Sequence, residues 1–97
     1  ATVMLDDILY FNSEGRKIHM VTTNGCDSFY YKLDEVEQLL QQKDHHFARI
    51  HKSYLVNTDY ITEYDKRTLT LETGQVLNIS RYDYYKEVHQ LKQALAQ

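Results

Sequence analysis

A hairpin signal at Asn24-Gly25 restricts the fold of this chain more than any other feature of its sequence. Residues 17–23 and 26–31 flank the signal, and the first of these β-prone runs alternates in period two. Asn-Gly suits the two-residue type I′ turn, because both central positions of that turn need positive φ. The sequence therefore predicts two antiparallel strands joined at Asn24-Gly25.

Short β-prone runs recur along the rest of the chain. Residues 7–11 form an apolar run suited to a buried strand, and Glu14-Gly15 follows as a turn. Further strands are predicted at residues 48–50, 60–64, 68–72 and 76–79, with Thr73-Gly74 as the turn between the last two. This pattern predicts a mainly β fold, in which small antiparallel sheets are joined by tight turns.

Two segments change to helical periodicity. A helix capped by Asp34 is predicted first, and its apolar face carries Val36, Leu39 and Leu40. At Ser80 the spacing to Asp83 is that of a capping box with a shorter acid, and the apolar face that follows carries Val88, Leu91 and Leu95. The fold is thus expected to include one or two short helices, the last being either a lid on the core or a dimer contact.

Composition places the chain among folded globular domains. Its 97 residues suit a single domain, and a content of 42% hydrophobic and 26% charged residues argues against disorder. The single Cys26 cannot form an internal disulfide, which favours a reducing cytoplasm; no signal sequence or membrane-spanning run is recognisable. The formal net charge of −3 lowers the expectation of nucleic-acid binding.

Three windows without acidic residues modify that expectation. Residues 15–26, 45–57 and 73–82 together hold five lysines and arginines and no carboxylate, whereas the rest of the chain holds six cations and fourteen acids. This clustering is close to what chance would give. An acidic protein can still present one basic surface, provided that folding brings the three windows together.

The second window contains the most unusual segment, Phe47-x-Arg49-Ile50-His51-Lys52-Ser53-Tyr54-Leu55-Val56-Asn57. With the apolar run at 7–11, the pair Tyr60-Ile61, a hairpin Gly74 and Ser80-Arg81, it resembles the LytTR family of bacterial DNA-binding domains, almost from end to end. The resemblance implies an elongated fold of small antiparallel sheets that binds DNA sequence-specifically. It implies that loops reach bases in two successive major grooves while the body faces the minor groove between them.

Carried over to this chain, the family's contact loops coincide with the three windows. The candidate DNA-binding residues are Arg16, Lys17, His19, Arg49, His51, Lys52, Ser53, Arg81 and Tyr82. Arg81 is the best candidate for reading a base, because its planar fork can pair with guanine O6 and N7. Lys52 stands where the family commonly has arginine, which favours a phosphate contact. Arg49 is divided between a structural ion pair and a phosphate contact, and Asp83 would oppose a phosphate at the start of the last helix.

Other functions find less support in the residues. His51 and Ser53 lack a third group to orient them for nucleophilic catalysis, so no enzyme activity is expected. Asp44, His45 and His46 are adjacent and more typical of a solvated turn than of a metal site, so neither metal nor cofactor is expected. Phe47, Ile50, Leu55 and Val56 are expected in the core, and Asn57 in a turn. The remaining alternative is a protein-interaction or ligand-sensing β domain that keeps the fold without the DNA contacts.

The resemblance also implies a cellular context. LytTR domains are usually the C-terminal output domains of two-component response regulators, so residues 1–97 are expected to be one domain excised from a longer chain with an N-terminal receiver domain. The expected partner is double-stranded DNA, in paired direct repeats bound by two copies. Regulation of bacterial transcription in the cytoplasm, without a membrane, is the expected role.

Overall fold

The computed structural model describes residues 3–43 and 46–95, except for the side chain of Leu95. In chain order the elements are η1 (Leu5–Asp7), β1 (Ile8–Glu14), β2 (Lys17–Thr22), β3 (Gly25–Tyr30), α1 (Leu33–Gln42), β4 (Phe47–His51), β5 (Tyr54–Asn57), η2 (Thr58–Tyr60), β6 (Ile61–Tyr64), β7 (Thr68–Leu71), β8 (Val76–Asn78) and α2 (Tyr82–Leu95). The prediction of a mainly β chain with two helices is confirmed.

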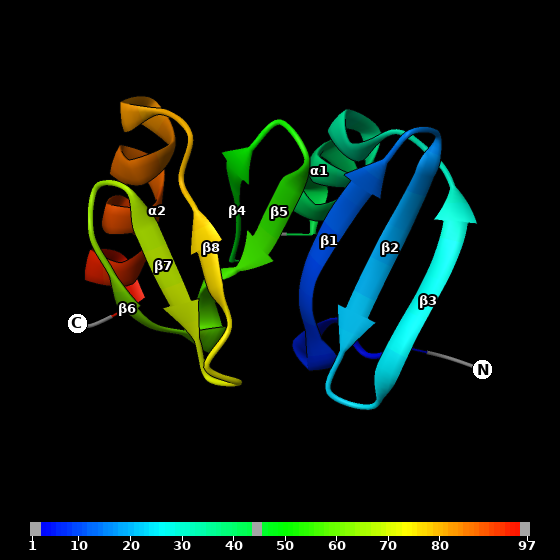
Figure 1. Cartoon of the computed structure of the whole chain (residues 1–97), viewed down its shortest axis with the longest axis horizontal. Coiled ribbons are helices and arrows are strands. Elements are labelled where there is room, and N and C mark those ends of the chain that lie inside the picture. The colour runs from blue at the N-terminus through cyan, green and yellow to red at the C-terminus, as the bar shows by residue number, and fades with distance from the viewer. Residues whose placement is uncertain (1–2, 44–45, 96–97) are drawn as a thin grey trace.

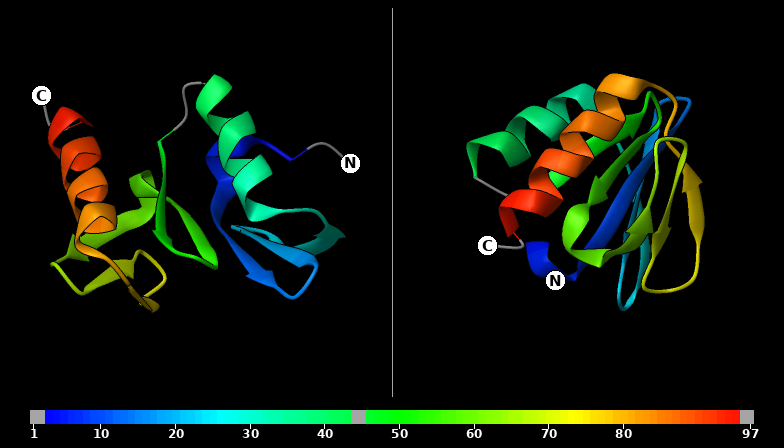
Figure 2. Two further views of the ribbon diagram at one scale, coloured as in Figure 1. Left: turned by 90° about the horizontal axis from the view of Figure 1, so that it is seen from above. Right: turned by 90° about the vertical axis from the view of Figure 1, so that its left-hand side faces the viewer.

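The strands form two antiparallel sheets. The first has the order β3-β2-β1-β5-β4 and the second the order β6-β7-β8 (Figure 1). Both helices lie on the same side of the molecule, behind the sheets as Figure 1 shows them, and Figure 2 shows them from two further directions. The molecule measures 33 × 28 × 25 Å, so the expected elongation is slight.

Strand β1, at the centre of the first sheet, is buried on both faces along residues 8–11, which explains its unbroken apolar run. Ile8 and Phe11 of β1 pack with α1 residues, whereas Leu9 and Tyr10 pack with the second sheet and α2. A register shift in the pairing of β1 with β2, between Ile8 and Tyr10, accompanies this change of face. The four predicted core residues of the 47–57 segment are all buried. Val88 of α2 is buried in the core that the second sheet forms with β1, β4 and β5. Helix α2 therefore covers this core, as the prediction of a lid describes.

The predicted hairpin forms, with its turn displaced by one residue. Thr22 pairs with Gly25, so the turn residues are Thr23 and Asn24, and Gly25 with φ 148° begins β3. The side-chain hydroxyl of Thr22 accepts a hydrogen bond from the amide of Asn24 at 3.1 Å and donates to the carbonyl of Gly25 at 3.2 Å. A threonine side chain therefore stabilises the turn from its first position.

Both predicted helix caps are wrong. α1 begins at Leu33, and Asp34 lies inside its first turn with its carboxylate 2.7 Å from a guanidinium nitrogen of Arg49. α2 begins at Tyr82, and the Asp83 carboxylate accepts hydrogen bonds from Arg81. In each case the acid pairs with an arginine, because a guanidinium is a stronger partner for a carboxylate than a backbone amide. Leu39 also departs from the prediction, since its side chain is 48% exposed.

The sequence prediction missed strand β5. Only residues 48–50 were expected as a strand in this part, but β4 and β5 form an antiparallel hairpin whose turn is Lys52-Ser53. The predicted role of Asn57 is confirmed, because its side chain accepts from the Asp59 amide and donates to the Ile8 carbonyl, both at 3.0 Å. Asp44 and His45, two residues of the rejected metal cluster, lie outside the described residues.

Candidate nucleic-acid interface

Folding brings one part of each of the three acid-free windows to the same edge of the molecule. The β1–β2 turn at Gly15-Arg16, the β4–β5 turn at Lys52-Ser53 and the segment 79–81 before α2 all lie at the upper edge in Figure 1. They follow one another along the longest axis of the molecule, from the first sheet to the second (Figure 1). We call residues 15–17, 51–53 and 80–82 the loop edge.

Backbone hydrogen bonds join the loops of this edge to one another. The amide of Ser13, close to the first turn, donates to the carbonyl of Ser53 at 2.9 Å. The amide of Ser80 donates to the carbonyl of Ile50 at the same distance. These bonds join Ser53 of the middle loop to strand β1, just before the first loop, and Ser80 of the last loop to strand β4, just before the middle loop.

The side chain of Arg49 stabilises the backbone of the middle loop by hydrogen bonds. Its guanidinium lies 2.7 Å from an oxygen of Asp34 and 2.9 Å from one of Glu37, and it donates to the backbone carbonyls of His51 and Lys52 at 2.9 and 2.6 Å. Burial lowers the pKa of Arg49, but the two carboxylates outweigh burial and raise it overall. Of the two predicted roles, the structural ion pair is the one observed. The side chain is only 12% exposed, and a phosphate contact by Arg49 stays untested.

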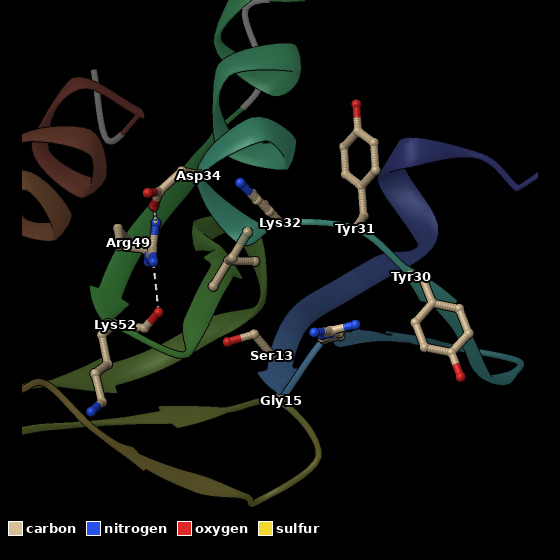
Figure 3. A pocket seen from close by; sticks show the side chains of 10 residues that line it. Ser13, Gly15, Tyr30, Tyr31, Lys32, Asp34, Arg49 and Lys52 are labelled. Atoms are coloured by element: carbon tan, nitrogen blue, oxygen red, sulfur yellow. Dashed lines mark hydrogen bonds and ion pairs between the residues drawn. The ribbon is translucent and has the colours of Figure 1, made fainter.

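The middle loop presents Lys52 and one imidazole nitrogen. The amide of Ser53 donates to Nδ1 of His51 at 3.1 Å, so Nδ1 is an acceptor and the ring proton belongs on Nε2. His51 can therefore donate from Nε2 to an acceptor outside the protein. Lys52 is exposed, and its side chain points away from Arg49 (Figure 3).

The first loop presents Arg16 and Lys17, both exposed. The ammonium of Lys17 lies 5.6 Å from the ring centroid of Tyr30, which is also exposed. His19 lies further along β2, half-buried, with Nδ1 2.7 Å from the hydroxyl of Ser28 on β3. Arg16 and Lys17 thus belong to the loop edge, and His19 lies outside it.

An open groove lies between the first loop, the middle loop and the start of α1. Its volume is about 640 Å³, and Arg16, Lys32 and Lys52 contribute to its lining together with the hydroxyl of Ser13 (Figure 3). Asp34 also lines it, but its carboxylate is bound to Arg49. Sequence reasoning missed Lys32 because Asp34 and Glu35 follow it, which places it outside the acid-free windows.

Arg81 is held on one edge and open on the other. Its Nε and Nη2 donate to the two carboxylate oxygens of Asp83 at 3.0 and 2.8 Å, and its guanidinium carbon lies 5.0 Å from the ring centroid of Tyr84. The pairing with Asp83 raises the pKa of Arg81. Asp83 does not occupy the other edge, which is formed by Nη1 and the second hydrogen of Nη2, although the Tyr84 side chain lies beside the guanidinium and also raises its pKa. That edge has the two parallel donors that guanine O6 and N7 accept.

Comparison with known proteins agrees with the geometry. A family profile described as the LytTr DNA-binding domain matches residues 1–95. The chain belongs to the LytTR family of DNA-binding domains. A solved structure with the same fold is the LytTr DNA-binding domain of a Bacillus cereus protein described as a methyl-accepting/DNA response regulator, with 22% identity and a TM-score of 0.76. That match covers 92% of this chain and 84% of the other. No curated protein sequence matches the chain.

Other kinds of site receive no support from this LytTR domain. Within residues 3–43 and 46–95, no group of three or more His, Cys, Asp or Glu side chains is placed to hold a metal ion. The helices of the same residues are too short or too polar to cross a membrane. Each of the three loops of the loop edge carries at least one exposed lysine or arginine, namely Arg16 and Lys17, Lys52, and Arg81.

Proposed function

We propose that this LytTR domain binds double-stranded DNA sequence-specifically and regulates transcription, with its loops reading bases in successive major grooves. The observation that supports this most directly is the convergence of three separate basic loops on one edge. The molecule is 33 Å long in the direction along which the loops follow one another. One turn of B-DNA is about 34–36 Å, so a loop edge that lies within the length of the molecule is compatible with contacts to neighbouring grooves.

Different residues carry different parts of the proposed contact. Arg81 reads a guanine with its open edge, which is worth roughly 1–3 kcal/mol of discrimination against another base. Arg16, Lys17 and Lys52 neutralise phosphates, and the Ser53 and Tyr82 hydroxyls suit phosphate oxygens. His51 adds a donor at Nε2. These contacts divide into base reading, by Arg81 with one residue from each of the other two loops, and phosphate contacts that position the protein on the duplex.

The wider setting is proposed on the same basis. We place the domain at the output end of a cytoplasmic response regulator, downstream of a receiver domain, because the Bacillus cereus protein with the same fold is described as a response regulator. Two copies on paired direct repeats would follow from that setting. The target genes depend on parts of the system beyond this chain.

Selection from a random duplex library tests the proposal. Wild-type protein and Arg81→Ala are run in parallel at moderate salt, and a motif enriched only by wild type is expected. Neutralising about four to six phosphates predicts a slope of log affinity against log salt of roughly −4 to −5. Lys52→Ala should weaken binding to all sequences alike. A folded wild-type protein with a slope near zero and no enriched motif would instead favour the protein-interaction domain.

A further inference from the structure

A fourth basic turn lies beside the loop edge, outside the acid-free windows. It joins β6 to β7 at residues 65–67, and it reaches up beside the start of α2 in the right-hand view of Figure 2. The amide of Ile79 donates to the carbonyl of Arg67 at 2.7 Å. The ammonium of Lys66 lies 5.9 Å from the ring centroid of Tyr82. The turn is therefore anchored to the same segment that carries Arg81.

The acid in this turn is engaged by the turn itself. One carboxylate oxygen of Asp65 accepts hydrogen bonds from the amides of Arg67 and Thr68 at 2.8 and 2.9 Å. These two amides, Arg67 first, hold the pKa of Asp65 below its usual value. This oxygen fixes the backbone of the turn, and Asp65 forms no ion pair with Lys66 or Arg67 within the described part of the chain, although its charge still acts on Arg67.

Lys66 and Arg67 are left free by this arrangement. Both side chains are exposed, and neither forms an ion pair with any residue of the described part of the chain. The ammonium of Lys86 also lies 5.9 Å from the Tyr82 ring. Around the start of α2 the cations are Lys66, Arg67, Arg81 and Lys86 and the acids are Asp65, Asp83 and Glu87, of which Asp65 and Asp83 are already hydrogen-bonded.

We propose that the β6–β7 turn is a fourth DNA-contact element, in which Lys66 and Arg67 bind phosphates on the flank of the site beyond Arg81. The inference rests on the proposed DNA binding and adds a contact that the three windows do not contain. Phosphate is the expected ligand because the turn lies beside the segment that precedes α2, on the side away from the other two loops (Figure 1). An exposed lysine and arginine without acidic partners are suited to positioning the protein on the backbone.

The double variant Lys66→Gln/Arg67→Gln tests this contact. Each phosphate contact contributes about 0.9 to the salt slope, so the double variant should have a slope shallower by about 2 and bind roughly tenfold or more weakly at 0.1 M salt. The preferred sequence should not change. Hydroxyl-radical footprinting on the selected site should lose protection only at the phosphates flanking the guanine assigned to Arg81.

Lys43→Gln is the matched control. Lys43 is an exposed cation just after α1, whose end points away from the loop edge (Figure 2). Its loss should leave both slope and footprint unchanged, and circular dichroism confirms that each variant is folded.

Three outcomes would overturn the inference. If the double variant has the wild-type salt slope while Arg81→Ala still loses site preference, the β6–β7 turn does not contact DNA, and the proposed function is unaffected. A shallower slope with an unchanged footprint identifies a long-range charge effect without contact. Wild-type protein without salt-dependent binding would overturn the proposed function and this inference with it.

Discussion

The middle loop and the start of α2 each contain an arginine, and the two arginines differ in what their surroundings leave free. Arg49 has its guanidinium bonded to two carboxylates and two backbone carbonyls, and it is largely buried. The side chain of Arg81 is 63% exposed and bonded on one edge to Asp83. The arginine of the middle loop thus fixes the backbone, whereas the arginine at the start of α2 is exposed and, among the described residues, forms an ion pair only with the neighbouring Asp83.

The difference shows that an arginine in a basic window is not automatically a ligand contact. Guanidinium has five N–H donors, and the number left without a partner decides what it can bind. Arg49 forms four hydrogen bonds to described residues and lies inside the fold. Arg81 keeps one complete edge.

The largest expected effect separates the two arginines by stability. Arg49→Met keeps the aliphatic stem but leaves two carbonyls and two carboxylates without their partner, so the free energy of unfolding should fall by about 2–4 kcal/mol. Arg81→Met should change it by no more than about 0.5 kcal/mol, because the site is exposed. Urea unfolding of both variants measures the difference. Equal losses of unfolding free energy in the two variants would show that Arg49 and Arg81 do not differ in their structural roles.

A smaller effect is expected from the acid beside Arg81. Asp83→Asn removes the charged partner that orients the guanidinium, so the preference for the selected site should fall by roughly three- to tenfold. The affinity for unrelated duplexes should rise, because the substitution removes one negative charge next to the loop edge. Fluorescence anisotropy with both DNAs measures the ratio, with Asp27→Asn on the exposed strand β3 as control. An increased preference would mean that Asp83 competes with DNA for Arg81.

The smallest expected effect concerns Glu87, whose carboxyl group interacts with the negative charges of Glu37, a partner of Arg49, and of Asp83, the partner of Arg81. Burial, and then the charges of Glu37 and Asp83, raise the pKa of this α2 carboxyl. A raised pKa in the folded state favours the protein below the ordinary glutamate value of 4.5, and this contribution is lost as pH rises through the folded pKa. Glu87→Gln should therefore be more stable than wild type at pH 7 by about 0.5 kcal/mol, and the difference should shrink towards pH 4.

Thermal unfolding across pH 4 to 8 measures this change, and the exposed Glu35→Gln on α1 serves as the control. A destabilised Glu87→Gln at neutral pH would show that the carboxylate makes a favourable contact, contrary to the effect of its burial.

Local patterns were sufficient to predict most elements of the fold. The apolar run at 7–11 and the anchors of the 47–57 segment identify buried strands, since their neighbours in sequence carry the signal. The hairpin turn was displaced by one residue because Thr22, not Asn24, stabilises it through its side chain. Strand β5 was missed because residues 54–57 were interpreted as part of a motif and not as a partner for β4.

The sequence predicted candidate site residues only where the charges that matter are close together along the chain. The windows identified Arg16, Lys17, Lys52 and Arg81, because acids are absent around them in sequence. They could not show that Arg49 pairs with a helix 12 and 15 residues earlier in the chain. They also excluded Lys66 and Arg67, whose neighbour Asp65 is an acid in sequence but is engaged by backbone amides in the fold.

The two backbone hydrogen bonds at Ser13–Ser53 and Ile50–Ser80 have a consequence for any DNA that meets the loop edge. The loops are ordered before the duplex arrives, so little conformational entropy remains to be lost on association. These bonds also limit how far the separation of the loops can change. If the proposed contacts form, a single base pair inserted between them, which lengthens the duplex by about 3.4 Å, should weaken the contacts of one outer loop.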